Sequence, residues 1–276
     1  MSHEPGLPVE IVAVGHELLS GRTVDSNAAW IAARLTDRGA WVRRIVAVDD
    51  DPAAVAREIG VARLSGAALV ITTGGLGPTA DDRTLAGIAG ALGRPLAEHP
   101  EALAFVARRY EQLARAGSVA DAVLSAPRRR MAALPVGSAP VDNRVGSAPG
   151  VLVEESDLTV LALPGVPAEM RAVFEAAGSA IAARLGAPRH VVEREVPSGC
   201  GDESVITVAV ERVLEAMPRV ALSLATAFAP GCDLPVRISA TAADRTTAEA
   251  TVAEAAARLG EELARVAAHA HTPART

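Results

Sequence analysis

The stretch LVITTGGLGPTADD, residues 69–82, decides the fold of this chain. It opens with a short run of leucine and β-branched residues, which predicts a buried β-strand. Three glycines and a proline follow within five residues, so we expect the chain to turn sharply there. Thr79 is then placed to cap a helix, with Asp81 and Asp82 in its first turn, where carboxylates suit the positive end of the helix dipole.

A strand, a glycine-rich loop and a helix in this order favour a ligand site. Such a unit leaves backbone N–H groups unpaired at the carboxyl end of a sheet, where open α/β folds bind ligands. Gly74, Gly75 and Gly77 let a phosphate approach the backbone closely, and Asp81 and Asp82 are suited to hold a divalent cation against it. The simpler interpretation is a structural turn followed by two helix-stabilising acids.

Composition limits the class of protein and its partners. The 276 residues predict one large domain or two, and the 50% hydrophobic content is enough for a sizeable core. Aromatic residues make up only 2%, which argues against base stacking on aromatic side chains. The net charge of -6, spread along the chain, argues against a nucleic-acid partner.

The chain contains no lysine, so every basic residue apart from histidine is arginine. This excludes Walker A phosphate loops, Schiff-base lysines and pyridoxal-phosphate enzymes. Any phosphate must therefore be bound by backbone amides, by arginine or by a metal ion.

Cysteine usage and the N-terminus favour a cytoplasmic protein. Cys200 and Cys232 lie far apart and form no CxxC pair, which argues against a disulfide framework or a structural zinc site. The first residues lack a basic region before an apolar run, so they do not form a signal peptide. No apolar stretch reaches the roughly 18 residues of a membrane span, and we expect no membrane partner.

The strand–loop–helix order recurs along the chain. Residues 9–14 predict a first strand, residues 15–22 a polar loop, and Asp25, Ser26 and Asn27 the cap of a helix that runs to about residue 35. Residues 158–163 and 164–169 repeat the strand and the loop, before a helix that runs to about residue 185. Parallel strands bring such loops to one edge of a sheet, so we expect four loops to converge there. These are residues 15–27, 72–82, 143–150 and 164–169.

The remaining segments complete an α/β pattern. Residues 41–48 predict a strand, and Asp49, Asp50 and Asp51 precede Pro52 as a helix N-terminus, with contact to substrate as the alternative. A helix is expected over 98–116, a charged turn at 128–130, a loop or edge strand over 131–140, and a hairpin of 151–153 with 158–163. After residue 186 the order is β-α-β-β-α: strands 190–196, 220–226 and 235–242, and helices 203–216 and 247–266.

The glycine-rich string resembles a family signature. Thr-Thr-Gly-Gly-x-Gly followed by an aspartate five residues on, here Asp82, is similar to the signature of the molybdopterin-binding fold family. More narrowly, GGLGPTADD resembles the version in the competence/damage-inducible protein A (CinA) family. Similar matches are GHELLSGRTVDSN at 15–27, NRVGSAPG at 143–150 and PGVPAEM at 164–170, and the resemblance covers about residues 9–266.

Two positions depart from the pattern of that family. His16 stands where an asparagine or aspartate is expected, which weakens the expectation of a ligand contact there. Arg144 stands where proline is usual, so the loop gains a cation for phosphate and loses rigidity. Members often continue into a further domain that deamidates nicotinamide mononucleotide; we expect that domain to be absent here and do not carry its activity over.

The resemblance implies both a fold and a reaction. The fold is a three-layer α/β/α molybdopterin-binding-like domain with a mostly parallel sheet at residues 1–186, followed by a small α+β domain at 187–276. The reaction is metal-dependent hydrolysis of a nucleotide diphosphate such as ADP-ribose, a pyrophosphatase activity. The catalytic residues would be Asp82, Asp81 and Asp25, and the ligands of a Mg, Co or Ni ion would be Asp81, Asp82 and Glu17. The substrate-binding residues would be Gly74, Gly75, Gly77, Thr79, Asn27, Asn143, Gly146, Ser147, Pro164, Gly165 and Glu169.

Two alternatives stay open beside hydrolysis. One is a molybdopterin-binding or adenylyltransferase-like protein of molybdenum cofactor metabolism, with a pterin or nucleotide phosphate as its ligand. The other is a regulatory binder without turnover. Because the molybdopterin-binding fold often self-associates, we expect a homodimer or homotrimer. The residues assign neither the metal nor the base that activates water.

Overall fold

The computed structural model describes residues 6–186, 189–224 and 233–270, which form two compact units. The larger unit comprises Leu7–Leu35 and Ala40–Gly186. The smaller unit consists mainly of the residues that follow Gly186. Among the described residues, no helix combines the length and the apolar character that crossing a membrane requires.

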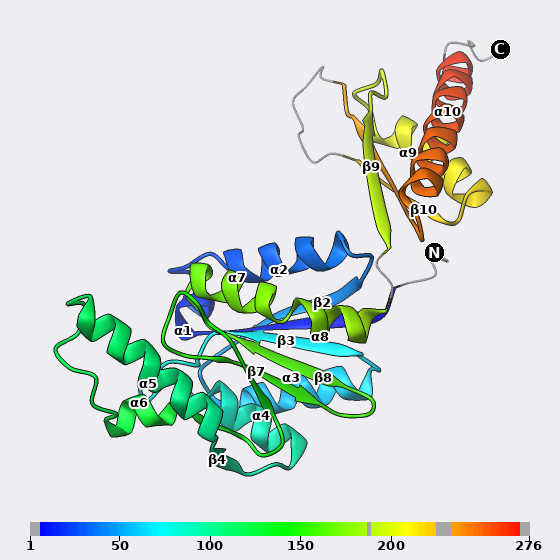
Figure 1. Ribbon diagram of the computed structural model, residues 1–276. Coiled ribbons are helices and arrows are strands. Elements are labelled where there is room, and N and C mark those ends of the chain that lie inside the picture. The colour runs from blue at the N-terminus through cyan, green and yellow to red at the C-terminus, as the bar shows by residue number, and fades with distance from the viewer. Residues whose placement is uncertain (1–5, 187–188, 225–232, 271–276) are drawn as a thin grey trace. The chain divides into compact units, whose positions relative to one another are not determined.

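A six-stranded sheet forms the centre of the larger unit, in the order β2-β1-β3-β8-β7-β6 (Figure 1). The first four strands are parallel, and β7 and β6 run antiparallel to their neighbours. The two central parallel strands, β3 and β8, are buried along their whole length, as expected for strands covered on both faces. The strand bounds are β1 (Pro8–Val14), β2 (Trp41–Val48), β3 (Leu69–Thr73), β6 (Ala139–Val141), β7 (Gly150–Glu154) and β8 (Thr159–Leu163).

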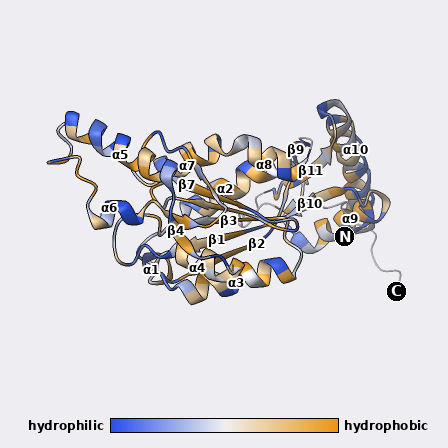
Figure 2. Cartoon of the chain, turned by 60° about the horizontal axis from the view of Figure 1, so that its bottom comes forward, coloured by the Kyte–Doolittle hydropathy of each residue, from blue (hydrophilic) through white to orange (hydrophobic). Residues whose placement is uncertain are grey.

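Helices cover both faces of this sheet, which confirms the predicted three-layer α/β/α arrangement. Successive side chains of β3 point to opposite faces, so Ile71 packs with Ile31 and Phe174 while Val70 packs with Ile59 in a separate cluster. Figure 2 shows the apolar residues concentrated along the central strands. The helices are α2 (Ser26–Thr36), α7 (Pro167–Ala176) and α8 (Gly178–Leu185) on one face, and α3 (Pro52–Leu64), α4 (Thr84–Leu92) and α5 (Pro100–Arg115) on the other.

The start of the helix after the glycine-rich loop differs from the prediction. Helix α4 begins at Thr84, so Thr79 does not cap it and Asp81 and Asp82 precede its first turn. Instead, the backbone N–H and the hydroxyl of Thr79 donate to Oδ2 of Asp82 at 2.8 and 2.5 Å. Such local hydrogen bonds compete with helix formation, and here they accompany a bend over residues 77–81.

Other element predictions are confirmed or refined. The antiparallel pairing of β7 with β8 confirms the hairpin, and β6 is an edge strand that overlaps the end of the range 131–140, where a loop or an edge strand is predicted. A short helix α1 (His16–Leu19) lies within the predicted loop, and the helix predicted to end near residue 185 is divided into α7 and α8 at Ala177. The predicted charged turn is the short helix α6 (Ala126–Arg130), beside a two-stranded sheet of β4 (Leu96–Glu98) and β5 (Ala133–Pro135).

The smaller unit is an antiparallel sheet with two helices packed on it, as predicted for an α+β domain (Figure 1). The strand order is β10-β11-β9, and Ile206, Ile238 and Leu259 lie in its core. Residues 225–226 of the strand predicted over 220–226, and Cys232, lie outside the described residues. The elements are β9 (His190–Val196), α9 (Glu203–Ala216), β10 (Val220–Leu224), β11 (Val236–Ala242) and α10 (Arg245–Ala270).

Candidate functional site

A pocket of about 270 Å³ lies where the four parallel strands end, at the carboxyl edge of the sheet. Three of the four predicted loops line it, through residues that include Asn27, Gly74, Gly75 and Gly165. Its most prominent feature is a set of five acidic side chains, which are Glu17, Asp25, Asp50, Asp81 and Asp82. An open α/β sheet binds ligands at this edge, so the pocket is the candidate functional site.

The glycine-rich loop is held tightly against the strand ends. Gly74 and Gly75 have φ angles of 106° and 66°, in the left-handed region that favours glycine. A Cβ on Gly74 would lie 2.1 Å from the carbonyl oxygen of Val14, so no larger residue fits there. The N–H of Gly74 donates to the carbonyl of Leu163 at 3.0 Å and is therefore not available to a phosphate. The N–H of Gly75 makes no hydrogen bond within the described residues and remains the better candidate.

Asn27 ties the first loop to the other two. Its Nδ2 donates to the carbonyl of Gly165 at 2.7 Å and to Oγ1 of Thr73 at 3.1 Å. The same Thr73 hydroxyl donates to the carbonyl of Pro164 at 3.1 Å, so Pro164 serves the loop junction. Within the described part of the chain, Oδ1 of Asn27 is buried without a hydrogen-bond partner. A buried acceptor of this kind, on a residue that lines the pocket, is suited to a ligand hydroxyl or amine, or to a cation.

Asp25 has the predicted capping role. Its Oδ1 accepts a hydrogen bond from the N–H of Ala28 at 2.9 Å, in the first turn of α2. A carboxylate at a helix N-terminus is stabilised by the helix dipole. Since only Oδ1 is used in this bond, Asp25 keeps a second carboxylate oxygen for the pocket.

Asp50 lines the pocket, whereas the sequence of its triplet favours a helix N-terminus. That role belongs to Asp51, which accepts from the N–H groups of Ala53 and Ala54. Burial raises the pKa of Asp50, and the nearby carboxylates of Glu17, Asp49 and Asp81 raise it further, against a hydrogen bond from the N–H of His16. A cation among these acids would relieve that repulsion. The sequence does contain a signal for Asp50, because it follows the end of β2. Since β2 is parallel to β1, residues that follow β2 lie near the loop that follows β1.

The two aspartates after the glycine-rich loop differ in their surroundings. Asp81 is exposed, and its pKa is lowered by the polar Thr79 hydroxyl nearby and by its own backbone N–H, so it stays ionised and suited to a cation. Asp82 uses Oδ2 to hold Thr79, which leaves Oδ1 for a ligand. A Cβ on Gly77 would lie 2.6 Å from that Oδ2. Gly77 and Thr79 thus shape the bend and do not line the pocket.

The acids fit a shared cation better than a closed metal site. No group of three or more His, Cys, Asp or Glu side chains within the described residues is arranged to hold a metal ion. Magnesium, however, is commonly bound by one or two carboxylates, with substrate phosphates and water as its other ligands. The exposed Asp81 and the neighbouring carboxylates of the pocket meet that requirement.

The fourth predicted loop, residues 143–150, lies against the start of α7 and does not line this pocket. Asn143 is fully buried, and its Nδ2 donates to the carbonyl of Ala148 and to Oε2 of Glu169 at 2.7 and 2.8 Å. Its Oδ1 accepts from the N–H groups of Val145 and Gly146, so no hydrogen-bonding group of Asn143 is left for a nucleotide.

The other loop residues support the same arrangement. A Cβ on Gly146 would lie 1.7 Å from Oε2 of Glu169, so a larger residue there would displace the carboxylate that accepts from Asn143. The Ser147 hydroxyl lies 3.9 Å from Sδ of Met131. The expected convergence of four loops on one pocket is therefore correct for three loops and wrong for the fourth. Asn143 and Glu169 act as a clasp between the fourth loop and α7, which becomes visible only when the chain is folded.

Comparison with known proteins agrees with this architecture. Residues 10–183 match the family described as "Probable molybdopterin binding domain". Protein PH0439 of Pyrococcus horikoshii is 42% identical over 206 residues, which is 75% of this chain and 79% of that protein. Protein PAE0875 of Pyrobaculum aerophilum is 39% identical over 253 residues, which is 91% of this chain and 92% of that protein.

A solved structure gives a match of the same kind. The crystal structure of the protein CinA with unknown function from Thermoplasma acidophilum is 38% identical to this chain, with a TM-score of 0.58. The match covers 64% of this chain and 98% of that one. Because the domain match spans more than half of the chain and contains the whole glycine-rich loop and its pocket, the protein belongs to the molybdopterin-binding domain family, as a CinA-like member.

Proposed function

We propose that this protein binds a nucleotide diphosphate such as ADP-ribose together with a divalent cation, and hydrolyses the diphosphate to release AMP. The observation that carries the proposal is the pocket at the carboxyl edge of the sheet. There, five carboxylates surround a glycine-rich loop, and burial and neighbouring acids raise the pKa of one of them, Asp50. Acidic pockets repel bare phosphate, so a phosphate ligand needs a cation to enter this one.

The residues of the pocket divide the work of hydrolysis. Asp81 and Asp82 hold the cation, with help from Glu17 or Asp25, and the N–H of Gly75 donates to a phosphate oxygen. A bound Mg, Co or Ni ion supplies charge neutralisation at the diphosphate and makes water a stronger nucleophile. The unpartnered Oδ1 of Asn27 accepts from a hydroxyl or amine of the nucleotide.

Asp50 is the base in this proposal. A base with a raised pKa holds a proton better than an ordinary carboxylate, and the His16 N–H keeps its Oδ2 in place at 2.9 Å. Asp50 takes the proton of the attacking water while the water oxygen bonds to phosphorus. The bond between phosphorus and the bridging oxygen breaks, which yields AMP and ribose 5-phosphate from ADP-ribose.

Incubation with ADP-ribose and Mg²⁺, Co²⁺ or Ni²⁺, followed by an assay for AMP, tests the proposal. We expect AMP with at least one of the metals and none when EDTA is added in excess. An Asp157→Asn variant should release AMP as the wild type does. It removes an exposed carboxylate that is paired with Arg63 and does not line the pocket. Absence of AMP with all three metals would count against hydrolysis of ADP-ribose.

A second candidate function follows from the domain match. The match of residues 10–183 to a probable molybdopterin-binding domain favours a pterin ligand, bound alone or in an adenylyltransferase-like reaction of molybdenum cofactor metabolism. Thermal unfolding with molybdopterin, ATP or AMP tests it, because a ligand that binds only the folded protein raises the melting temperature. A shift with molybdopterin in the absence of AMP production from ADP-ribose would favour this candidate.

A further inference from the structure

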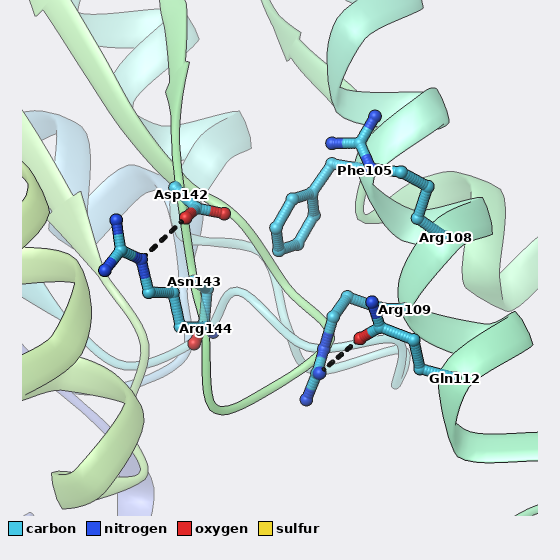
Figure 3. A pocket seen from close by; sticks show the side chains of 7 residues that line it. All are labelled: Phe105, Arg108, Arg109, Gln112, Asp142, Asn143 and Arg144. Carbon is cyan, nitrogen blue, oxygen red and sulfur yellow. Dashed lines mark hydrogen bonds and ion pairs between the residues drawn. The ribbon is translucent and has the colours of Figure 1, made fainter.

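A second pocket, of about 260 Å³, lies between α5 and residues 142–144 (Figure 3). It shares no lining residue with the candidate site at the carboxyl edge of the sheet. Its charged lining consists of Arg108, Arg109 and Arg144 against a single carboxylate, Asp142. The pocket is therefore positively charged in a chain whose net charge is -6. The site at the carboxyl edge has the opposite character, with five acids.

Arg109 supplies a fixed positive charge to this pocket. Its Nε donates to the carbonyl of Gly146 at 2.7 Å, Nη2 donates to the carbonyl of Val145, and Nη1 donates to Oε1 of Gln112 at 2.8 Å. The first two of these hydrogen bonds fasten the loop to α5, and the third lies within the helix. Because its partners are two neutral carbonyls and an amide, no carboxylate among the described residues neutralises the guanidinium.

Arg108 and Arg144 are available to a ligand. Arg108 is exposed and makes no hydrogen bond or ion pair within residues 6–186, 189–224 and 233–270. Arg144 contacts Asp142 at 3.2 Å, but the two side chains are 86% and 53% exposed. An exposed ion pair of this kind contributes little, so the guanidinium can turn toward an anion at small cost. In Figure 3 the two arginines come from different elements, with the ring of Phe105 between them.

We propose that this second pocket binds a phosphate group. Guanidinium groups donate in a planar fork that matches phosphate oxygens, and this chain has no lysine to take that role. Phe105 is only 7% exposed, so its ring forms part of the floor and offers no face for a base to stack on. Charge is therefore the means of recognition, and the ligand is either free phosphate or the phosphate of a nucleotide.

Calorimetric titration with inorganic phosphate and with AMP, in EDTA and low salt, tests this proposal. EDTA removes the cation that the acidic pocket needs. We expect saturable binding of at least one probe, weakened about tenfold by Arg108→Gln and by Arg144→Gln, since hydrogen bonds to charged groups are strong. Equal affinities assign recognition to the phosphate group alone, and tighter binding of AMP assigns a nucleotide. Added salt should weaken binding of both probes.

Arg115→Gln is the matched control for Arg108→Gln. It lies on the same helix, loses the same charge, is 78% exposed and is paired with Glu111 outside the pocket. We expect this variant to bind phosphate as the wild type does. An equal loss in all three variants, or no binding of either probe at millimolar concentrations, would overturn the proposal. Asp82→Asn should leave this binding unchanged, so the result is independent of the proposed hydrolysis.

Discussion

Replacing Glu10 with alanine is expected to lower the free energy of unfolding by about 3 kcal/mol, because it removes a buried carboxylate and leaves the partly buried guanidinium groups of Arg43 and Arg44 short of a partner. Glu10 lies on β1 and is 1% exposed. Its carboxylate accepts from Arg43, from Nε of Arg44 at 2.8 Å and from the Ser65 hydroxyl at 3.0 Å. Arg44 also contacts Glu58 at 2.8 Å, so this network ties β1 and β2 to α3. Urea denaturation at neutral pH measures the loss.

Asp157→Ala is the control for Glu10→Ala. Asp157 contacts Arg63 at 2.8 Å, but both side chains are substantially exposed, at 52% and 40%. Exposed pairs of this kind contribute little to stability because water screens them. The urea midpoint of Asp157→Ala should therefore stay close to that of the wild type. Similar losses of unfolding free energy in both variants would show that the contribution of Glu10 does not depend on its burial.

The same network predicts how stability depends on pH. Burial alone would raise the pKa of Glu10, but hydrogen bonds from Arg43, Arg44 and Ser65 outweigh it and hold the pKa below the ordinary 4.5. A carboxyl group whose pKa is lower in the folded state contributes stability above its unfolded pKa and loses it as the pH falls through the folded value. The stability difference between the wild type and Glu10→Gln should therefore narrow below about pH 4.5.

Asp50→Asn is expected to lower the rate of AMP release by about 10²- to 10⁴-fold, the usual contribution of a general base. The amide oxygen of asparagine can still accept the His16 N–H, so the melting temperature should change little. Because Asp50 must lose its proton to act as a base, activity should rise with pH through its pKa, which burial raises while the bound cation relieves the repulsion from Glu17 and Asp81. Steady-state assays across pH measure both effects, and the rising limb should disappear in Asp50→Asn.

Asp49→Asn is the matched control for Asp50→Asn. Asp49 is the adjacent aspartate, is 54% exposed and lies 3.4 Å from the His16 ring, and it does not line the pocket. We expect this variant to keep most of its activity. Equal losses in the two variants would indicate a general effect of acidic charge near the pocket and would remove Asp50 from the role of base.

Local sequence determined the parts of this molecule that could be predicted without a structure. The apolar run 69–73 and the glycines after it require a buried strand and a turn with positive φ angles, and both are present. The predicted start of α4 was wrong because Thr79 and Asp82 form a hydrogen bond with each other. Residue propensities alone do not show whether Thr79 will cap a helix or take part in such a bend. The clasp of Asn143 with Glu169 joins residues that are 26 positions apart, which no local pattern reveals.

The composition of the site was predictable only in part, for a related reason. Strand order decides which loop residues share a pocket. The adjacency of β2 and β1 brings Asp50 beside Glu17, whereas the antiparallel β7 directs the 143–150 loop to the start of α7. The hydrogen bond from Gly74 to Leu163 likewise depends on the pairing of β3 with β8. The residue types indicated what kind of ligand the loops could bind, and the strand order determined which of those residues line the same pocket.

The acidic pocket is expected to bind a diphosphate through a cation. Calorimetric titration with an ADP-ribose analogue whose bridging oxygen is replaced by a methylene group tests it most directly, because no turnover occurs. We expect binding in Mg²⁺ that is lost in EDTA and at least about tenfold weaker in Asp82→Asn, since weakening a metal site commonly costs that much. Equal binding in EDTA and Mg²⁺, or unchanged binding by Asp82→Asn, would contradict it.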